Sequence, residues 1–375
     1  MRVLLLHNRY RSQGGEERAV TEMAALLERR GHGVRVLERS SAALDHRRAA
    51  RGLLTGGLNP DEVADAVREH GAEIVHAHNL HPLFGWRALA AARAAGARTV
   101  LQLHNFRLFC SIGVSFRHGR PCYSCRGRNT LPGVAHRCRG GIVESAVYAA
   151  GLHRQQPELL AQADAIVVLS RAHGGRLHEL GVPPAKTTVV PNFIAASGWA
   201  QETRAGEGGY ALVAGRLVEE KGFDTAVRAA RAAGVPLVVA GTGPDEPRLR
   251  ELAAGADVRF VGWVSAEELA RLRAGAALSL APSRCEEACP YSVLDALAAG
   301  LPTLVSDLGG LPELVARNAV LPVGDVGAWA AATGALWRDS QGRRSHGEAA
   351  LIEARYRFGE ARAYADLMAV YGCEP

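Results

Sequence analysis

The sequence predicts an α/β protein with two doubly wound, Rossmann-like domains, and three observations support this fold class. The chain has 375 residues, which is too long for one typical core and suits two domains of roughly 150 to 200 residues each. Short apolar segments alternate with amphipathic ones, the pattern of parallel sheets covered by helices on both faces. This alternation occurs twice, before and after a stretch of small and polar residues without periodicity.

The order of the expected elements sets the domain boundaries. In the first half we expect strands at RVLLLH, GVRVLE, EIVHAH, ARTVLQLH, AIVVLS and TTVVPN, and a first helix over residues 16–30 with one apolar face. In the second half we expect strands at YALVAG, PLVVAG, VRFVGW, ALSLAP and PTLVSD. The prediction is a first domain over 1–192, a linker over 193–209, a second domain over 210–345 and a C-terminal helical segment over 346–375.

Composition and net charge limit the classes of protein to which the chain can belong. Hydrophobic residues make up 48% and charged residues 22%, as in an ordinary soluble globular protein. The net charge of +6 is spread along the chain, which permits an anionic ligand or a weak membrane-surface contact but does not favour nucleic acid. The N-terminal apolar run is too short for a signal peptide, and no run reaches the roughly 18 to 20 residues of a membrane span. We therefore expect a cytoplasmic protein, with peripheral membrane association left open.

An excursion over residues 106–141 interrupts the alternation, because it has neither strand nor helix pattern. It contains four cysteines, Cys110, Cys122, Cys125 and Cys138, in a chain whose compartment favours reduced thiols. A Cys-x2-Cys pair with two outlying cysteines can close a tetrahedral site, and a structural zinc would order a segment that has no core. His118 or His136 is close enough in sequence to replace one cysteine. The alternative is unpaired thiols in a flexible lid.

The same excursion is rich in arginine, which opens a different class of function. Together with the cysteines, such a cluster would suit a zinc-containing nucleic-acid-binding protein with a phosphate-binding surface. Aromatic residues are not interleaved with the arginines, and an anionic acceptor or lipid headgroups would suit them equally. The cluster comprises Arg117, Arg120, Arg126, Arg128, Arg137 and Arg139.

Glycine and basic residues follow two of the expected strands. Gly14 and Gly15 precede the first helix, where exposed backbone amides suit an anionic group, although an ordinary strand-to-helix turn explains them too. The spacing matches neither the dinucleotide fingerprint nor a P-loop. In the second half, Arg216 stands just beyond a strand and Lys221 just before a helix, where two cations would neutralise a diphosphate. The alternative is solvated surface charge.

Two carboxylates frame the segment SRCEEACPYSVLDALAAG, residues 283–300. Glu287 lies in the loop after a strand, and we expect a helix to begin near Pro290, because proline is favourable at the first helical position. At roughly 1.5 Å per residue, Asp295 then lies about 7 to 8 Å along that helix. A loop acid and a helix acid flank a helix N-terminus that favours anions. This layout suits a sugar–diphosphate–ribose.

Several segments together carry a resemblance to a known family: GRLVEEKGFD, AGTGPDEPRLRELA, VRFVGWVSAEELARL, LAPSRCEEACPYSVLDALAAGLPTLVSDLGGLPELV and the leading GGEE…LLERRGHGV. In this order, over nearly the whole chain, they resemble family 4 of the glycosyltransferases. The resemblance implies the GT-B fold, two Rossmann-like domains facing a central cleft, and nucleotide-sugar-dependent transfer with retained anomeric configuration. The first half is similar to bacterial members with HNRYR, HAHN, LHNFRLFC and a cysteine-bearing insertion.

The resemblance also implies roles for individual residues. Arg216 and Lys221 match the basic pair that holds the donor diphosphate. Glu287 and Asp295 match the Glu-x7-Glu signature, in which the first acid addresses the donor sugar and the second the ribose. The remaining matches are His104 near the reacting sugar, Gly15 in a phosphate-side loop, Trp263 and Val264 at the base, and Cys289, Pro290, Tyr291 and Ser292 as the loop whose amides meet the sugar and β-phosphate. Two departures are Asp295 in place of Glu, and Pro290, which cannot donate a hydrogen bond.

The function that follows is hexosyl transfer from a nucleotide-diphosphate sugar to an acceptor hydroxyl, in polysaccharide, glycoconjugate or natural-product biosynthesis. A UDP-sugar is the expected donor, and the acceptor, a small molecule or a lipid-linked one, belongs to the first domain. The second domain is expected to bind the donor, and no catalytic metal is expected. Alternatives are a nucleotide-sugar epimerase or phosphorylase on the same scaffold, a nucleic-acid-binding protein, or a partner protein without catalytic activity.

Overall fold

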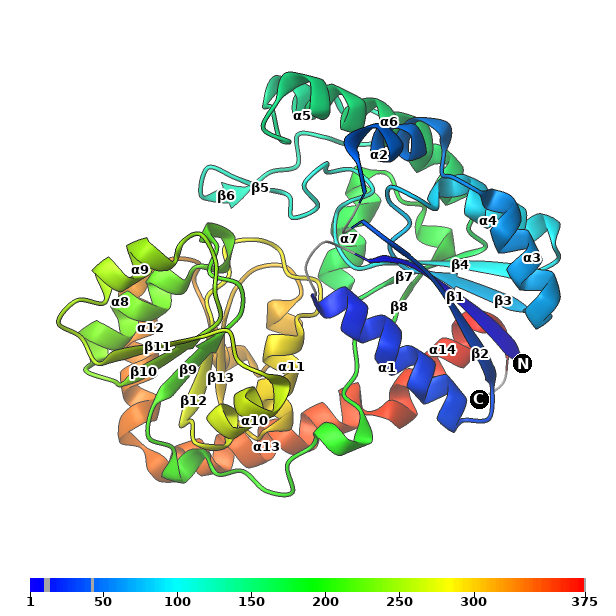
Figure 1. Ribbon diagram of the computed structural model, residues 1–375. Helices are drawn as coiled ribbons and strands as arrows, with labels where there is room; N and C mark the ends of the chain where they lie inside the picture. Colours follow the sequence, from blue (N-terminus) through cyan, green and yellow to red (C-terminus); the bar gives the residue numbers. More distant parts are fainter. Residues whose placement is uncertain (10–13, 42–43, 374–375) are drawn as a thin grey trace. The chain divides into compact units, whose positions relative to one another are not determined.

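The computed structural model describes residues 1–9, 14–41 and 44–373, and the chain forms two compact α/β units (Figure 1). Unit 1 comprises Met1–Ser115, Cys122–Pro191 and the residues from Ala363 onward, and unit 2 comprises Phe116–Pro121 and Asn192–Arg362. The predicted fold class, two Rossmann-like α/β domains, is confirmed. The expected linker over 193–209 lies within unit 2, and the expected C-terminal segment over 346–375 is divided between the units.

Unit 1 contains a six-stranded parallel sheet in the order β2-β1-β3-β4-β7-β8. All six strands expected for this half are present. Their bounds are β1 Arg2–Arg9, β2 Gly33–Ser40, β3 Ile74–Ala77, β4 Arg98–Leu103, β7 Ala165–Val168 and β8 Thr187–Val189. Val3 to Leu6 of β1 are completely buried, because a parallel sheet is covered on both faces and its central strands are apolar throughout.

In the described part of the chain, seven α-helices of unit 1 precede β8 in the sequence. They are α1 Gly15–Arg29, α2 His46–Thr55, α3 Pro60–His70, α4 Gly85–Ala94, α5 Leu131–Ala135, α6 Ile142–Gln162 and α7 Arg171–Leu180. The excursion is mostly irregular, as expected, and contains α5 and a small antiparallel hairpin formed by β5 Phe116–Arg117 and β6 Arg120–Pro121.

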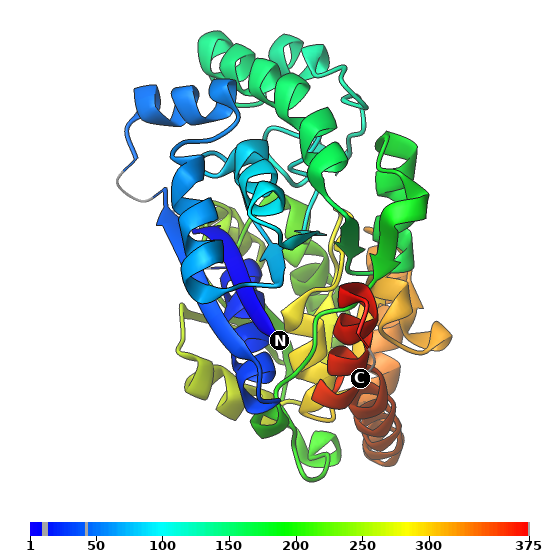
Figure 2. The same cartoon turned by 90° about the vertical axis from the view of Figure 1, so that its right-hand side faces the viewer.

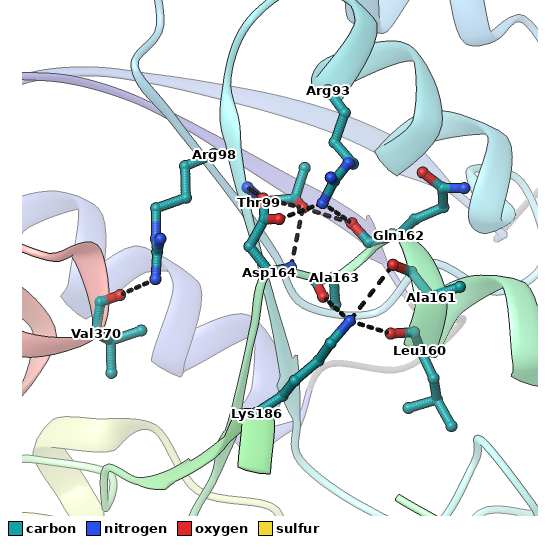
Figure 3. Close-up of polar contacts among 10 residues, drawn as sticks. All are labelled: Arg93, Arg98, Thr99, Leu160, Ala161, Gln162, Ala163, Asp164, Lys186 and Val370. Carbon is teal, nitrogen blue, oxygen red and sulfur yellow. Dashed lines mark hydrogen bonds and ion pairs between the residues drawn. The ribbon is translucent and has the colours of Figure 1, made fainter. Parts of the chain in front are cut away.

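The carboxyl end of α6 is fixed to the sheet by a polar cluster (Figure 3). Lys186 Nζ, just before β8, donates hydrogen bonds to the carbonyl oxygens of Leu160, Ala161 and Ala163 at 3.1, 3.5 and 2.8 Å. A cation at this position satisfies carbonyls that have no partner within the helix and interacts favourably with the helix dipole. The Asp164 carboxylate accepts hydrogen bonds from the Thr99 amide at 2.9 Å and the Thr99 hydroxyl at 3.0 Å, which joins the helix end to β4.

The last helix, α14 (Glu360–Tyr371), completes unit 1 from the far end of the sequence. The Tyr371 hydroxyl lies 2.8 Å from His76 Nδ1 of β3. Arg98 of β4 donates to the Val370 carbonyl at 3.4 Å. Tyr371 is almost completely buried, so the helix is part of the core of this unit.

Unit 2 contains a second six-stranded parallel sheet, in the order β11-β10-β9-β12-β13-β14. The strands are β9 Ala211–Ala214, β10 Leu237–Ala240, β11 Val258–Gly262, β12 Leu278–Ala281, β13 Thr303–Ser306 and β14 Val320–Leu321. The first five were expected, whereas β14 has only two residues and leaves no periodic signal. Helices of this unit are α8 Phe223–Ala233, α9 Glu246–Leu252, α10 Ala266–Ala274, α11 Tyr291–Ala298, α12 Val326–Arg338 and α13 Ser340–Phe358.

Candidate functional site

Two loops of unit 2 meet at the carboxyl ends of neighbouring strands, β9 and β12. Gly222 follows the β9 loop with φ of 66°, and a Cβ atom placed on it would lie 2.1 Å from the Pro282 carbonyl oxygen. Only glycine allows both this left-handed backbone and this close approach. The Arg284 amide donates to the Glu220 carbonyl at 2.8 Å and fixes the same junction. The chain therefore holds residues 220–222 against residues 282–287.

An ion pair between Lys221 and Glu287 is the result of this junction. Lys221 Nζ donates to Glu287 Oε1, and the Ser283 hydroxyl donates to the same oxygen at 2.9 Å. The two charged side chains are 23% and 15% exposed. Because the pair is largely desolvated, its charges interact more strongly than an exposed pair would.

The pKa values of both Glu287 and Lys221 are shifted from their ordinary values. Burial opposes ionisation of Glu287, but Lys221, the Ser283 hydrogen bond and Arg216 outweigh it and hold the pKa of Glu287 below its ordinary value. Burial likewise opposes the charge on Lys221, but Glu287 and Cys285 outweigh it and raise the pKa of Lys221 above its ordinary value. Both groups are therefore charged near neutral pH.

Arg216 follows β9, and its exposed side chain lies beside Glu220 in the loop that also contains Lys221. One guanidinium nitrogen lies 4.0 Å from Glu220 Oε1, and the side chain is 62% exposed. Its positive charge is one of the causes that lower the pKa of Glu287. The structure thus brings together three of the predicted residues, Arg216, Lys221 and Glu287, as two cations and one carboxylate beside a strand end.

The helix α11 carries the second predicted acid. It begins at Tyr291, and Pro290 occupies the N-cap rather than the first helical position that we expected. Arg273 of α10 donates to Asp295 Oδ2 at 2.9 Å, and these side chains are 10% and 16% exposed. The acid expected to bind a ribose is therefore already bound by a guanidinium. Ahead of the helix, the Cys289 carbonyl accepts a hydrogen bond from Asn192 Nδ2 at 2.7 Å, which fixes the loop before α11, whereas Tyr291 and Ser292 are the first two residues of the helix.

The predicted base-binding residues lie after β11. Trp263 is 76% exposed and Val264 is half-buried. An exposed aromatic side chain at a strand end is available for stacking, and it belongs to the same edge of the sheet as the loop after β9.

In unit 1, His104 follows β4 and joins a row of stacked imidazole rings. His104 Nε2 lies 2.9 Å from His78 Nδ1, and the His78 ring stacks on His76 with centroids 4.8 Å apart. Burial is the main cause that lowers the pKa of His104 to about 3 and the pKa of His78 well below its ordinary value. Both rings are neutral at physiological pH, so one of them donates the hydrogen bond and the other accepts it.

A small cavity with mixed polar and apolar lining adjoins His104. Its volume is about 30 Å³, and the lining includes Glu16, His78, His81, Asn105 and Arg107. A cavity of this size has room for about two water molecules, or for a hydroxyl group in place of one.

Gly15 lies near this cavity, at the first position of α1. Its neighbour Glu16 accepts a hydrogen bond from Asn105 Nδ2 at 3.4 Å, which connects the start of α1 with the end of β4. Gly14 caps the helix, and its amide donates to Glu17 Oε2 at 2.8 Å. Two carboxylates therefore occupy the first turn, whereas we expected amides exposed to an anion. Residues 10 and 11, the last two of the HNRYR motif, lie outside the described residues.

Both halves of the chain match models of glycosyltransferase families. Residues 13–197 match the model described as Glycosyltransferase Family 4, and residues 208–339 match the model described as Glycosyl transferases group 1. The chain is a family 4-like glycosyltransferase of the GT-B fold. This agrees with the resemblance seen in the sequence and with the pair of Rossmann-like sheets.

Individual relatives of this glycosyltransferase point the same way. It is 30% identical over 208 residues to the amylovoran biosynthesis glycosyltransferase AmsK of Erwinia amylovora, a match that covers 50% of each chain. It therefore spans about half the length of this curated relative. Two solved structures share its fold at 16% identity: sucrose-phosphate synthase from Thermosynechococcus elongatus, with a TM-score of 0.70 and coverage of 99% and 98%, and Anabaena HepE in complex with UDP, with 0.69 and coverage of 99% and 100%.

The predicted zinc site of this glycosyltransferase is not found. Among residues 1–9, 14–41 and 44–373, no group of three or more His, Cys, Asp or Glu side chains is placed to hold a metal ion. Cys122 Sγ lies 3.6 Å from the Ser124 hydroxyl, and Cys125 Sγ lies 3.9 Å from the Thr130 carbonyl oxygen. Burial raises the pKa of Cys125 to about 11, and the neighbouring thiols of Cys110, Cys138 and Cys122 also raise it. Cys110 and Cys138 form no disulfide.

Three polar residues that contact predicted site residues were not identified from the sequence: Ser283, His78 and Arg273. Ser283 directly follows the strand-ending proline and could have been noticed by its position. His78 belongs to the HAHN motif, which carried the family resemblance without a role for this residue. Arg273 left no signal, because its partner is 22 positions away on another helix.

Proposed function

We propose that this protein transfers a hexosyl group from a nucleotide-diphosphate sugar, with a UDP-sugar favoured, to an acceptor hydroxyl, and that the anomeric configuration is retained. The observation that carries the proposal is the desolvated Lys221–Glu287 pair with Arg216 beside it, at the carboxyl end of a parallel sheet. Ligands of open α/β sheets bind at this end. The crystallisation of the structural neighbour HepE with UDP and with UDP-glucose supports a donor of this class.

The chemistry follows from the charges. Arg216 and Lys221 face the diphosphate and stabilise the negative charge that grows as it leaves the sugar. Glu287, held ionised by Lys221, accepts hydrogen bonds from sugar hydroxyls. Asp295 addresses the ribose, and Trp263 and Val264 lie against the base. The leaving β-phosphate oxygen takes the proton of the acceptor hydroxyl on the same face of the sugar, so no carboxylate acts as a nucleophile.

His104 and the cavity beside it contribute the acceptor side in unit 1. A neutral imidazole can donate one hydrogen bond and accept another, which suits the positioning of a sugar hydroxyl. Because its pKa is about 3, His104 is uncharged at physiological pH. Gly15 adjoins this cavity through Glu16 and Asn105.

A ligand panel followed by a transfer assay tests the proposal. Thermal unfolding is measured with UDP, GDP, ADP and dTDP and with their common sugars, because a ligand at 100 times its Kd stabilises the fold by about 2.7 kcal/mol. One nucleotide series is expected to raise Tm, and Lys221→Met is expected to abolish the shift. Release of the nucleotide diphosphate only with an acceptor present separates transfer from epimerase or phosphorylase activity, and NMR of the product shows the anomeric configuration. A panel without any shift would refute the donor site.

A further inference from the structure

An apolar surface on unit 1 lies within the most basic part of the chain. Three large hydrophobic side chains, Leu131 of α5 and Ile142 and Val143 of α6, are 74%, 55% and 73% exposed. They fall within 13 consecutive residues, whereas the described residues contain nine such exposed side chains in total. Clustered exposed hydrophobic residues indicate an interaction surface, whereas single ones do not. We call Leu131, Ile142 and Val143 the apolar tip.

The apolar tip continues along one face of α6. Ile142, Ala146 and Ala150 are exposed and lie four residues apart, so they share a face of the helix. The opposite face packs into the unit through Ser145, Ala149 and Leu152, together with Gly151, Gln155, Gln156 and Leu159. The first turns of α6 therefore present an uncharged side to solvent, and the exposed side becomes polar only at His153 and Arg154.

Two contacts hold α5 and α6 in this arrangement. The Thr130 hydroxyl, at the start of α5, donates to the Ala149 carbonyl of α6 at 2.7 Å, which holds the start of α5 against α6. The Arg139 amide donates to the Ser145 hydroxyl at 3.1 Å. The apolar tip is therefore a fixed surface rather than a frayed helix end.

Basic residues lie close to the apolar tip and on the helix that packs against α6. Arg139 pairs with Glu144 at 3.0 Å and lies over the Tyr148 ring at 4.2 Å, and Arg128 contacts His153 at 3.0 Å. Further along α6, the helix α2 packs closely against it, since a Cβ atom placed on Gly151 would lie 3.0 Å from Leu53 Cβ. Figures 1 and 2 both show α2, α5 and α6 together at one end of unit 1.

The helix α2 adds three exposed arginines, Arg47, Arg48 and Arg51. Segments 44–58 and 122–150 together contain seven arginines and two carboxylates, a formal net charge of +5, whereas the entire chain has +6. These two segments therefore carry a concentrated positive charge, in contrast to the even spread along the chain that we expected. An exposed apolar surface with a basic border matches the interface of an anionic bilayer, in which hydrophobic side chains enter the headgroup region and arginines meet lipid phosphates.

We infer that the apolar tip and its arginine border bind the surface of a membrane that contains anionic phospholipids. Apolar burial and electrostatic attraction act together, and each arginine near such a surface contributes about a five-fold gain in affinity at low salt. None of the described helices is both long and apolar enough to cross a membrane, so the contact is peripheral. The inference concerns a different surface from the proposed donor site and does not depend on it.

Vesicle binding tests this inference, with the nucleotide-free protein and sucrose-loaded vesicles of phosphatidylcholine with or without phosphatidylglycerol. The wild type is expected to sediment with the anionic vesicles, less so as salt is raised, and only weakly with phosphatidylcholine alone. The double variant I142E/V143E is expected to have a vesicle partition coefficient at least ten-fold lower than that of the wild type. The triple variant R47Q/R48Q/R51Q is expected to lose the preference for anionic lipid while it keeps the residual binding.

A matched control comes from unit 2. Ile352 and Tyr356 lie four residues apart on α13 and are 72% and 79% exposed, but the adjacent charges balance. The variant I352E/Y356E is expected to bind vesicles within two-fold of the wild type. Since all the substituted side chains are exposed, Tm confirms that each variant folds.

Three outcomes would overturn the inference. The first is a wild type that does not sediment with anionic vesicles, and the second is an equal loss in I142E/V143E and in the control. The third is a wild type that does not bind vesicles and shows one of two other activities. It either forms a dimer that I142E/V143E dissociates, or binds an oligonucleotide independently of Ile142 and Val143. Those results would assign the surface to a second copy of the chain or to nucleic acid.

Discussion

The Lys221–Glu287 pair gives the most demanding prediction, because the structure fixes its sign, its size and its pH dependence. In Lys221→Met the cation is lost and Glu287 remains desolvated beside Ser283. Breaking a buried pair in this way costs about 3 to 5 kcal/mol of unfolding free energy. Since the side chains are 23% and 15% exposed, we expect the lower end of this range. For a unit of this size that corresponds to a fall in Tm of about 6 to 12 °C.

The companion variants separate the pair from the single charges. Glu287→Gln keeps the hydrogen bond to Ser283 but leaves Lys221 without its counter-charge. In the double variant K221M/E287Q neither charge is buried alone, so its loss of stability is expected to be smaller than the sum of the two single losses by about 2 kcal/mol. Urea unfolding of the four proteins, followed by circular dichroism, measures this difference. Additivity within about 0.5 kcal/mol would show that the two groups do not stabilise one another.

The pH dependence supplies an independent check. The folded pKa of Glu287 lies below its ordinary value, so its contribution is present above about pH 4.3 and is lost as pH falls through the folded pKa. The folded pKa of Lys221 is raised, so its contribution is present below about pH 10.4 and is lost as pH rises through the folded pKa. The stability difference between wild type and Lys221→Met is therefore largest near neutral pH and shrinks in acid. A difference that grows in acid would refute the assignment.

Three further predictions concern other parts of the molecule. Arg216→Ala is expected to lower kcat on the order of 100-fold with little change in Tm, because the side chain is 62% exposed, and unchanged turnover would remove it from the diphosphate site. Arg273→Met removes the guanidinium that binds Asp295 Oδ2, so the KM for the donor is expected to rise more than the KM for the acceptor; equal rises would indicate a general structural defect. Lys186→Met uncovers three carbonyls at the end of α6 and is expected to cost about 2 kcal/mol in thermal unfolding, with Lys186→Arg as the control that recovers most of it.

Parallel strands were the most predictable feature of this fold. A strand that is buried on both faces is a short continuous apolar run, so segments such as VLLL are recognisable without any knowledge of their neighbours. The exception is β14, in which only Val320 and Leu321 pair with β13. Two residues cannot show a period, and their pairing depends on the register of the neighbouring strand.

The donor residues were predictable as members of a site but not as partners. Lys221 was expected to balance the adjacent acids or to bind a ligand, and the structure pairs it with Glu287, 66 positions away. The pairing depends on the approach of Gly222 to the Pro282 carbonyl, a contact between two loops that local patterns do not encode. The same limit applies to the cysteines, whose spacing allowed a metal site that the fold of the excursion does not form.

The place of α14 in unit 1 has a consequence for the order in which the protein can be made. Residues 1–191 emerge first from the ribosome, yet the hydroxyl that meets His76 belongs to Tyr371, and the carbonyl bound by Arg98 belongs to Val370. The first unit begun is therefore completed only after almost the whole of unit 2 has been synthesised. Until then β3 and β4 lack the helix that covers them, so the nascent first unit depends on its last helix to bury its core.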